Sequence, residues 1–184
     1  MIEISPRDFE PNVPDVQAAP RDNGLLELIV LRPAVDVREI VMDGQLDLSV
    51  GLVGDSWIAR GSASTPDGSA SPERQLTLMN VRVLKAIEPD PARWPLAGDQ
   101  LYVDLDLSIE NLPAGTHWAI GSAVIEISEP PHTGCAKFSA RFGSDALRWI
   151  NSPTGRALRM RGLNARIVTP GAIRTGDTIR RVTE

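Results

Sequence analysis

The feature that most constrains the fold of this chain is a series of short apolar segments separated by turns. The clearest lies at 101–107, where leucine and valine occupy every second position, with Asp104 and Asp106 on the opposite face. This alternation predicts a strand with one buried face and one face toward solvent. Further strands are predicted at 25–31, 75–87, 118–127, 163–169 and 172–182. Many short strands with few helices predict a mainly β (α+β) fold, a β-barrel or barrel-like sheet with short helical insertions.

Few segments have helical character. Helices are predicted at 35–42, 144–150 and 152–160. The last of these has Ser152 at an N-cap position and Pro153 at the first helical position, a combination typical of a helix start. Residues 61–74 are rich in glycine, serine and proline, so they are expected to form a mobile loop between elements.

The length of 184 residues is enough for one domain with a sizeable core, and aromatic residues make up only 4% of the chain. We therefore expect a core of leucine, isoleucine, valine and alanine. Residues 5–23 are rich in proline and aspartate. Residues 1–24 are predicted to be an N-terminal arm, and residues 25–184 a single domain.

Charge is distributed unevenly along the chain. Residues 132–184 carry 10 Lys/Arg and 3 Asp/Glu, a net charge of +7, whereas residues 1–131 carry 9 and 21, a net charge of −12. The two halves either neutralise each other across a folded interface or leave an anion site near the start of the basic part. The overall net charge of −5 argues against a general nucleic-acid binder.

The compartment is predicted from what the sequence lacks. No stretch approaches the roughly 20 apolar residues of a membrane span, and residues 1–5 lack the basic and apolar regions of a signal peptide. The chain has one cysteine, which cannot form an intramolecular disulfide. These observations predict a cytoplasmic protein that does not associate with membranes.

That cysteine is the strongest candidate for chemistry. Cys135 follows His132 by three residues and precedes Lys137 by two, in a loop bounded by proline and glycine. A cation or imidazolium beside a thiol favours the thiolate, which attacks electrophiles and binds soft metals. We therefore predict that Cys135 is a functional thiol, with His132 ordering the loop or tuning the thiolate. A buried structural cysteine is the alternative.

Several segments together resemble a known family. They are residues 104–116, with Asn-Leu-Pro-Ala-Gly-Thr at 111–116; Ile-Gly at 120–121; Pro-His-Thr-Gly-Cys-Ala-Lys-Phe at 131–138; Arg-Gly-Leu-Asn-Ala-Arg-Ile-Val at 161–168; and Gly-Asp at 176–177. In this order they resemble the MOSC family, whose domains are related to the C-terminal part of molybdenum-cofactor sulfurase. The resemblance extends over 25–182. It is strongest over 98–182 and implies a β-barrel-like domain with small helices.

The resemblance also implies a role for the cysteine. In the family this residue ligates molybdenum in a pterin dithiolene cofactor or carries sulfur for its delivery, and Cys135 stands at its position. Related members reduce N-hydroxylated bases and amidoximes, so a molybdenum-dependent reductase of such substrates is the first expectation. The pterin carries a phosphate or nucleotide, which needs a basic wall. Candidate residues are His132 beside the thiol and, for the cofactor, Asn111, Lys137, Arg141, Arg148, Arg156, Arg159, Arg161 and Arg166.

One segment departs from the family pattern. Many relatives continue a Gly-Asp pair with basic and His-Gly residues, whereas here Gly54-Asp55 is followed by Ser56-Trp57, with Arg60 nearby.

Other functions are weighed against the reductase. A sulfur carrier would form a persulfide on Cys135 and would have a cysteine desulfurase as its partner. A reductase would have an electron-donor protein and a small-molecule substrate. A non-catalytic binding module would use the loop only as structure. A zinc site needs about four ligands. The only other histidine is His117 and there is no second cysteine, so such a site would have to recruit carboxylates and is disfavoured. Pyridoxal phosphate, associated with the family through the desulfurases, would need Lys85 or Lys137.

Overall fold

The computed structural model describes residues 8–183, and within them seven strands close into a barrel. Their order around the barrel is β1–β6–β5–β9–β8–β7–β11, and the ring closes because β11 pairs with β1. β5 and β6 run parallel, and the other pairs are antiparallel. The barrel strands are β1 (Gly24–Leu31), β5 (Leu76–Asn80), β6 (Leu101–Asp104), β7 (His117–Ile120), β8 (Ala123–Pro131), β9 (Leu163–Thr169) and β11 (Thr178–Arg181). The predicted α+β barrel with short helices is confirmed.

Smaller elements surround this barrel. β2 pairs with the C-terminal end of β1 and extends the sheet there. β10, β3 and β4 form a separate three-stranded sheet. These strands are β2 (Glu39–Val41), β3 (Asp43–Asp47), β4 (Gly51–Leu52) and β10 (Gly171–Arg174). The helices are η1 (Glu10–Asn12), α1 (Val13–Gln17), α2 (Trp57–Arg60), η2 (Pro72–Arg74), α3 (Val81–Ile87), η3 (Pro91–Ala97), α4 (Ala136–Phe142), α5 (Ser144–Ile150) and α6 (Pro153–Ala157). No helix in residues 8–183 is long and apolar enough to cross a membrane.

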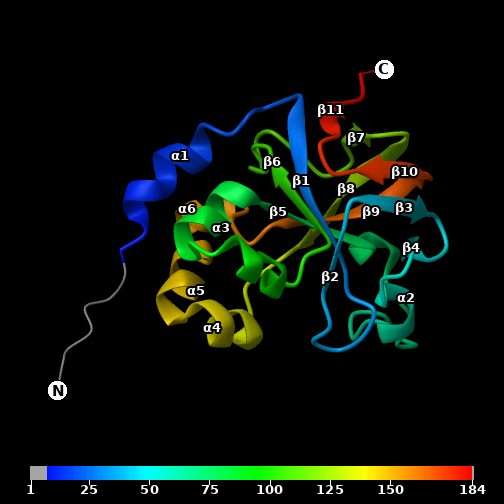
Figure 1. The fold of residues 1–184 in the computed structure, drawn as a ribbon, viewed down its shortest axis with the longest axis horizontal. Helices are drawn as coiled ribbons and strands as arrows, with labels where there is room; N and C mark the ends of the chain where they lie inside the picture. The colour runs from blue at the N-terminus through cyan, green and yellow to red at the C-terminus, as the bar shows by residue number, and fades with distance from the viewer. Residues whose placement is uncertain (1–7, 184) are drawn as a thin grey trace.

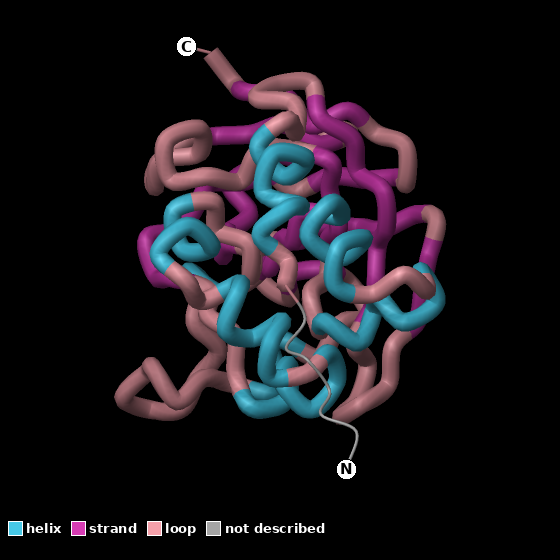
Figure 2. The backbone as a smooth tube through the Cα atoms, turned by 90° about the vertical axis from the view of Figure 1, so that its left-hand side faces the viewer, coloured by secondary structure: helices cyan, strands magenta, loops and turns pink. Residues whose placement is uncertain are grey.

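Five of the α-helices gather on one side of the barrel, whereas α2 lies beside β4 on the other side (Figure 1). α1, α3, α4, α5 and α6 lie together in Figure 1, away from the sheet of β3, β4 and β10. Viewed from that side, the helices stand in front of the strands (Figure 2). The barrel therefore has a helical layer on one flank and a small sheet on another.

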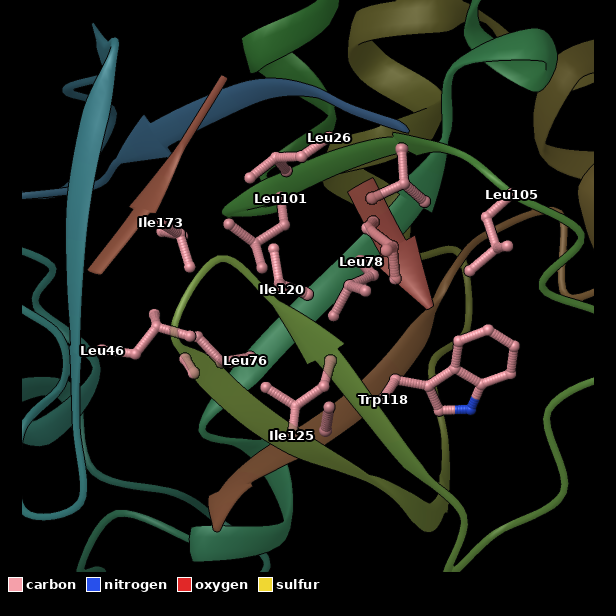
Figure 3. Close-up of a cluster of buried hydrophobic side chains, with 14 of the residues drawn as sticks. Leu26, Leu46, Leu76, Leu78, Leu101, Leu105, Trp118, Ile120, Ile125 and Ile173 are labelled. Carbon is pink, nitrogen blue, oxygen red and sulfur yellow. The ribbon is translucent and has the colours of Figure 1, made fainter. Parts of the chain in front are cut away.

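Two apolar clusters hold these layers together. The first fills the barrel, where Leu26, Leu78 and Ile125 point toward one another from different strands (Figure 3). The second lies between the barrel and the helices and includes Tyr102 and Phe138. β6 contributes to both clusters because its side chains alternate between the barrel interior and the helical layer.

Several sequence predictions change in the structure. The strand predicted at 118–127 is divided into β7 and β8, and the strand predicted at 172–182 is divided into β10 and β11. Residues 39–41 of the predicted helix at 35–42 form strand β2, because β1 offers its backbone hydrogen bonds there. The predicted strand at 75–87 ends after β5, and α3 follows from an Asn80 N-cap whose side chain accepts a hydrogen bond from the Arg82 N–H. Asp104 does not simply face solvent, since it forms an ion pair with Arg82 at 2.7 Å.

The N-terminal segment packs against the helical layer. Phe9 and Val16 belong to the second cluster, and the Phe9 ring stacks on Trp149 with centroids 5.3 Å apart. Residues 1–7 of the predicted arm lie outside the described residues. The division into an arm and a domain stays a prediction, as does the mobility of 61–74.

Candidate functional site

The cysteine loop joins the end of β8 to the start of α4. Cys135 is the N-cap of α4, with an extended backbone, and its side chain is exposed. Burial of the sulfur raises its pKa. The backbone N–H groups of Phe138 and Lys137, and the positive charges of Arg161 and Lys137, outweigh this effect. The pKa of the Cys135 thiol therefore lies below its ordinary value.

A buried carboxylate orders the residues behind this loop. Asp99 is fully buried, and its two oxygens lie 3.0 Å from His132 Nε2 and 2.7 Å from Arg161 Nη1. Arg161 also donates to the Ala97 carbonyl oxygen at 2.9 Å and lies over the Phe138 ring. Asp99 thus connects the cysteine loop, through His132, to the residue that leads into β9.

Protonation within this network follows from burial and charge. Burial alone would raise the pKa of Asp99, but Arg161 and His132 lower it to about 2. For His132, burial and the charge of Arg161 outweigh the attraction of Asp99, and its pKa falls below 6.5. At neutral pH His132 is therefore uncharged and holds the loop in place, while Arg161 and Lys137 supply the positive charge near the thiol.

Acid is expected to destabilise this network in two steps. The pKa of His132 is lower in the folded state than in the unfolded state. The contribution of His132 to stability is therefore complete above pH 6.5 and is lost as pH falls through the pKa of the folded state. The Asp99 contribution, about 2 kcal/mol, is complete above pH 3.8 and is lost as pH falls toward about 2. Urea unfolding at pH 7, 5.5 and 4 measures the first step. The His132→Gln variant is expected to remove it, and an identical pH profile in this variant would contradict the assignment.

A basic cavity of about 340 Å³ includes the loop residues His132 and Thr133 in its lining. Its other walls come from the end of β8, the end of α5, α6 and the turn before β9. Arg156, Arg159 and Arg161 contribute positive charge, and Glu129 contributes one negative charge. Cys135 follows Thr133 by two residues and is not part of the lining itself.

Two polar atoms in this cavity lack partners. Within residues 8–183, Ser128 Oγ and Arg161 Nε are buried and have no hydrogen-bond partner, and both residues line the cavity. Leaving such donors unpaired costs free energy. A ligand whose acceptor atoms reached these two donors would recover that free energy.

Arg159 is held at the edge of this cavity. Its Nη1 donates to the Leu112 carbonyl oxygen at 2.6 Å, and burial lowers the pKa of its guanidinium. Asn151 orders the loop from the end of α5, because its Oδ1 accepts a hydrogen bond from the Gly134 N–H at 3.3 Å. Both residues position the walls around the candidate ligand.

The structure places some predicted residues together and others apart. His132, Arg156, Arg159 and Arg161 line the cavity, and Lys137 lies beside Cys135 on α4. Other predicted residues contact groups elsewhere: Arg141 binds Asp36, Arg148 binds Asp145, Arg166 binds Glu126, and Asn111 donates to the carbonyl oxygens of Arg21 and Asp106. Among the described residues, no group of three or more His, Cys, Asp or Glu side chains is placed to hold a metal ion.

Sequence analysis missed the residues that organise the site. Asp99 and Ser128 belong to no motif, and the partners of Asp99, His132 and Arg161, are far away along the chain. The one sequence feature near Asp99 is Gly98, which ends η3 with a φ of +94°. A carboxylate between a helix stop and a buried strand is the pattern that points to Asp99.

Comparison with known proteins identifies the family. A family model described as the MOSC domain matches residues 66–180, more than half of the chain. The chain belongs to the MOSC domain family. The matched part of this MOSC chain runs from the loop before β5 into β11, and so includes the cysteine loop, α4 and most of the cavity wall. No curated protein matches the sequence.

Solved structures share the fold of this MOSC chain at low sequence identity. YuaD protein from Bacillus subtilis superposes with a TM-score of 0.63 at 17% identity, covering 88% of this chain and 97% of that one. YiiM from Escherichia coli gives a TM-score of 0.56 at 18% identity, covering 87% and 70%. YiiM from Geobacillus stearothermophilus gives 0.55 at 14%, covering 90% and 75%. These similarities show the shared architecture.

Proposed function

We propose that this MOSC chain binds a molybdenum cofactor, with Cys135 as the protein ligand of the metal. The observation that carries the proposal is the exposed Cys135 thiol, whose pKa is lowered. It follows by two positions in the chain a residue, Thr133, that lines a cavity with three arginines. A thiolate is the soft anionic ligand that a metal beside dithiolene sulfurs requires. The guanidinium groups of these arginines suit the phosphate of a phosphorylated pterin.

The residues present fit such a group. The orphan donors Ser128 Oγ and Arg161 Nε require acceptors, and a pterin with its phosphate offers many. Arg156 and Arg159, on and just after α6, would hold the phosphate, while the Asp99–Arg161 ion pair keeps Arg161 in place. When bound, the cofactor supplies a metal centre that exchanges two electrons and an oxygen atom with a substrate.

The remaining roles belong to the chain itself. Cys135 would bind the metal as a thiolate, the form that the Lys137 and Phe138 N–H groups favour. His132 orders the loop from its bond with Asp99. The proposed substrates are small N-hydroxylated bases or similar compounds, whose N–OH group would take up two electrons and two protons and release its oxygen as water. The two electrons then come from a separate electron-donor protein.

Molybdenum retention tests this proposal without an activity assay. Protein purified from a host that makes the cofactor is expected to carry close to one molybdenum atom per chain, measured by elemental analysis, together with the pterin, measured by its fluorescence after oxidation. Cys135→Ser is expected to lose most of the metal, since a hydroxyl is a much poorer ligand for it than a thiolate.

Two arginine variants form a matched control. Arg156→Ala, in the cavity, is expected to reduce pterin content, whereas Arg166→Ala, on the outer face of β9, is expected to leave it unchanged. Absence of molybdenum from the wild-type protein, or equal content in wild type and Cys135→Ser, would reject the proposal.

The exposure of the thiol also supports a second candidate, a sulfur carrier. The Cys135 thiolate would attack the outer sulfur of a persulfide on a cysteine desulfurase. The S–S bond of the donor breaks, a new S–S bond forms at Cys135, and the donor cysteine leaves as a thiolate. After incubation with a desulfurase and cysteine, mass spectrometry is expected to show one added sulfur, about 32 Da, on Cys135. An unmodified thiol would remove this candidate. If both tests fail, the remaining candidate is a non-catalytic binding module.

A further inference from the structure

A separate hollow of about 270 Å³ lies beside α2, away from α4 and α5 in Figure 1. Its wall comes from α2 and from the two ends of the 61–74 loop, and it is lined by Trp57, Arg60, Gly61, Ser62, Ser71 and Arg74. No aspartate or glutamate from residues 8–183 is among these lining residues. Two guanidinium groups therefore share one hollow that has no acid in its wall.

The charge of Arg60 is only partly compensated. Within residues 8–183, the one carboxylate less than 4 Å from its guanidinium group is that of Asp55, whose Oδ1 lies 3.8 Å from Nη2, beyond hydrogen-bond distance. Both oxygens of Asp55 already accept hydrogen bonds from Arg32, at 2.7 and 2.9 Å. Burial and the charge of Arg32 lower the pKa of Arg60, and the attraction of Asp55 does not offset them. The Arg60 side chain is still 45% exposed, so a ligand in the hollow can reach it.

Arg74 stands at the other end of the loop, as the last residue of η2, and is exposed. Its backbone N–H donates to the Ser71 carbonyl oxygen at 2.9 Å, which fixes the backbone beside the hollow. In the part of the chain that the structure describes, its guanidinium group forms no ion pair or hydrogen bond. All of its N–H donors are therefore available to a ligand.

Two neutral donors stand in the same wall. Ser71 is 8% exposed and Trp57 is 6% exposed. Among residues 8–183, neither the Ser71 hydroxyl nor the Trp57 indole N–H has a hydrogen-bond partner, and each of these atoms keeps some exposure. Because both residues line the hollow, an acceptor bound there would satisfy donors that the fold leaves unpaired.

We infer that this hollow binds a phosphate group, held between the guanidinium groups of Arg60 and Arg74, with Ser71 and Trp57 as additional donors. A phosphate monoester carries about −1.5 to −2 charges and three acceptor oxygens, which match two guanidinium charges and donors from several directions. The paired N–H groups of arginine fit such oxygens. A carboxylate has one charge and two oxygens, and it would leave part of this wall unpaired.

This phosphate site is separate from the cavity beside the cysteine loop. The two share no lining residue, so phosphate binding at α2 does not depend on the proposed molybdenum cofactor. Arg60 precedes the 61–74 loop and Arg74 ends it. A bound phosphate would therefore connect the two ends of this loop.

Titration of the full chain with inorganic phosphate at constant ionic strength tests the site. Backbone amide shifts measured by NMR are expected to saturate at residues 57–62 and 71–74. Acetate is expected to bind there at least tenfold more weakly, and equal binding of the two anions would overturn the assignment to phosphate. Shifts that stay linear over the whole molecule, or that saturate only at residues 128–133 and 155–163 around the other cavity, would overturn the site itself.

Variants of the lining residues separate binding from a structural role. Arg60→Gln and Arg74→Gln are each expected to weaken phosphate binding at least tenfold. Arg180→Gln, which removes an exposed arginine of β11 outside the hollow, is expected to leave phosphate binding unchanged. Saturating phosphate should raise the melting temperature of the wild type but not that of Arg74→Gln, while the two should melt alike without phosphate. Undiminished phosphate binding in both lining variants would overturn the inference.

Discussion

The Asp99→Ala variant is expected to unfold with a free energy lower by about 3–5 kcal/mol, because it leaves a buried charge without its partner. The side chain of Asp99 is fully buried and that of Arg161 is 7% exposed. Removing the carboxylate leaves the largely buried Arg161 guanidinium without its ion-pair partner, and it also frees His132. Urea unfolding monitored by tryptophan fluorescence measures the loss.

The matched control is another ion pair of almost the same length. Asp43 and Arg174 are 2.6 Å apart, compared with 2.7 Å for Asp99 and Arg161, but both of their side chains are more than 60% exposed. Asp43→Ala is expected to leave stability nearly unchanged, since exposed pairs contribute little. Similar losses in both variants would show that burial does not decide the effect. In the double variant Asp99→Ala with Arg161→Met, part of the stability should return.

The Gly162→Ala variant is expected to lose about 3 kcal/mol or more, since it combines backbone strain with a clash that cannot relax easily. Gly162 has a φ of +104°, and a Cβ added there would stand 2.2 Å from the Leu78 carbonyl oxygen. That oxygen belongs to a buried barrel strand. The same Cβ would lie 3.4 Å from the His132 ring, so the cavity should be disturbed as well.

Gly176 separates the two causes. Its φ is +97°, nearly the same as that of Gly162, but a Cβ there would meet nothing within 4 Å. Gly176→Ala is expected to cost only the conformational part, about 1–2 kcal/mol. Thermal unfolding of both variants measures the difference. Equal melting temperatures would mean that the space around Gly162 is less restricted than the structure indicates.

Much of the fold follows from sequence pattern. Alternation at 101–107 predicts that Leu101, Val103 and Leu105 share a buried face, and all three lie inside the barrel. Ser152 caps α6 as predicted, accepting a hydrogen bond from the Gly155 N–H at 3.0 Å. One failure lies where the local pattern is ambiguous and pairing with another strand decides the outcome. Glu39–Val41 becomes a strand because β1 is available beside it.

Less of the candidate site can be predicted in this way. The thiol was expected to be accessible, and the structure shows Cys135 exposed. Choosing among the arginines was not possible from their spacing, because each one finds whatever acceptor the fold brings near. Arg166 meets Glu126 on the neighbouring strand, while Arg161 turns inward to Asp99. Such pairings depend on contacts between residues 40 to 62 positions apart in the chain.

The closure of the barrel by β1 and β11 has a consequence for synthesis on the ribosome. Gly24 of β1 pairs with Ile179 of β11. The barrel therefore cannot close until β11 has emerged from the ribosome. Until then the nascent chain presents unpaired edges on β1 and β7, which are surfaces prone to improper association. Folding that depends on such a distant contact is expected to be slow. The growing polypeptide is therefore expected to need protection until β11 has been synthesised.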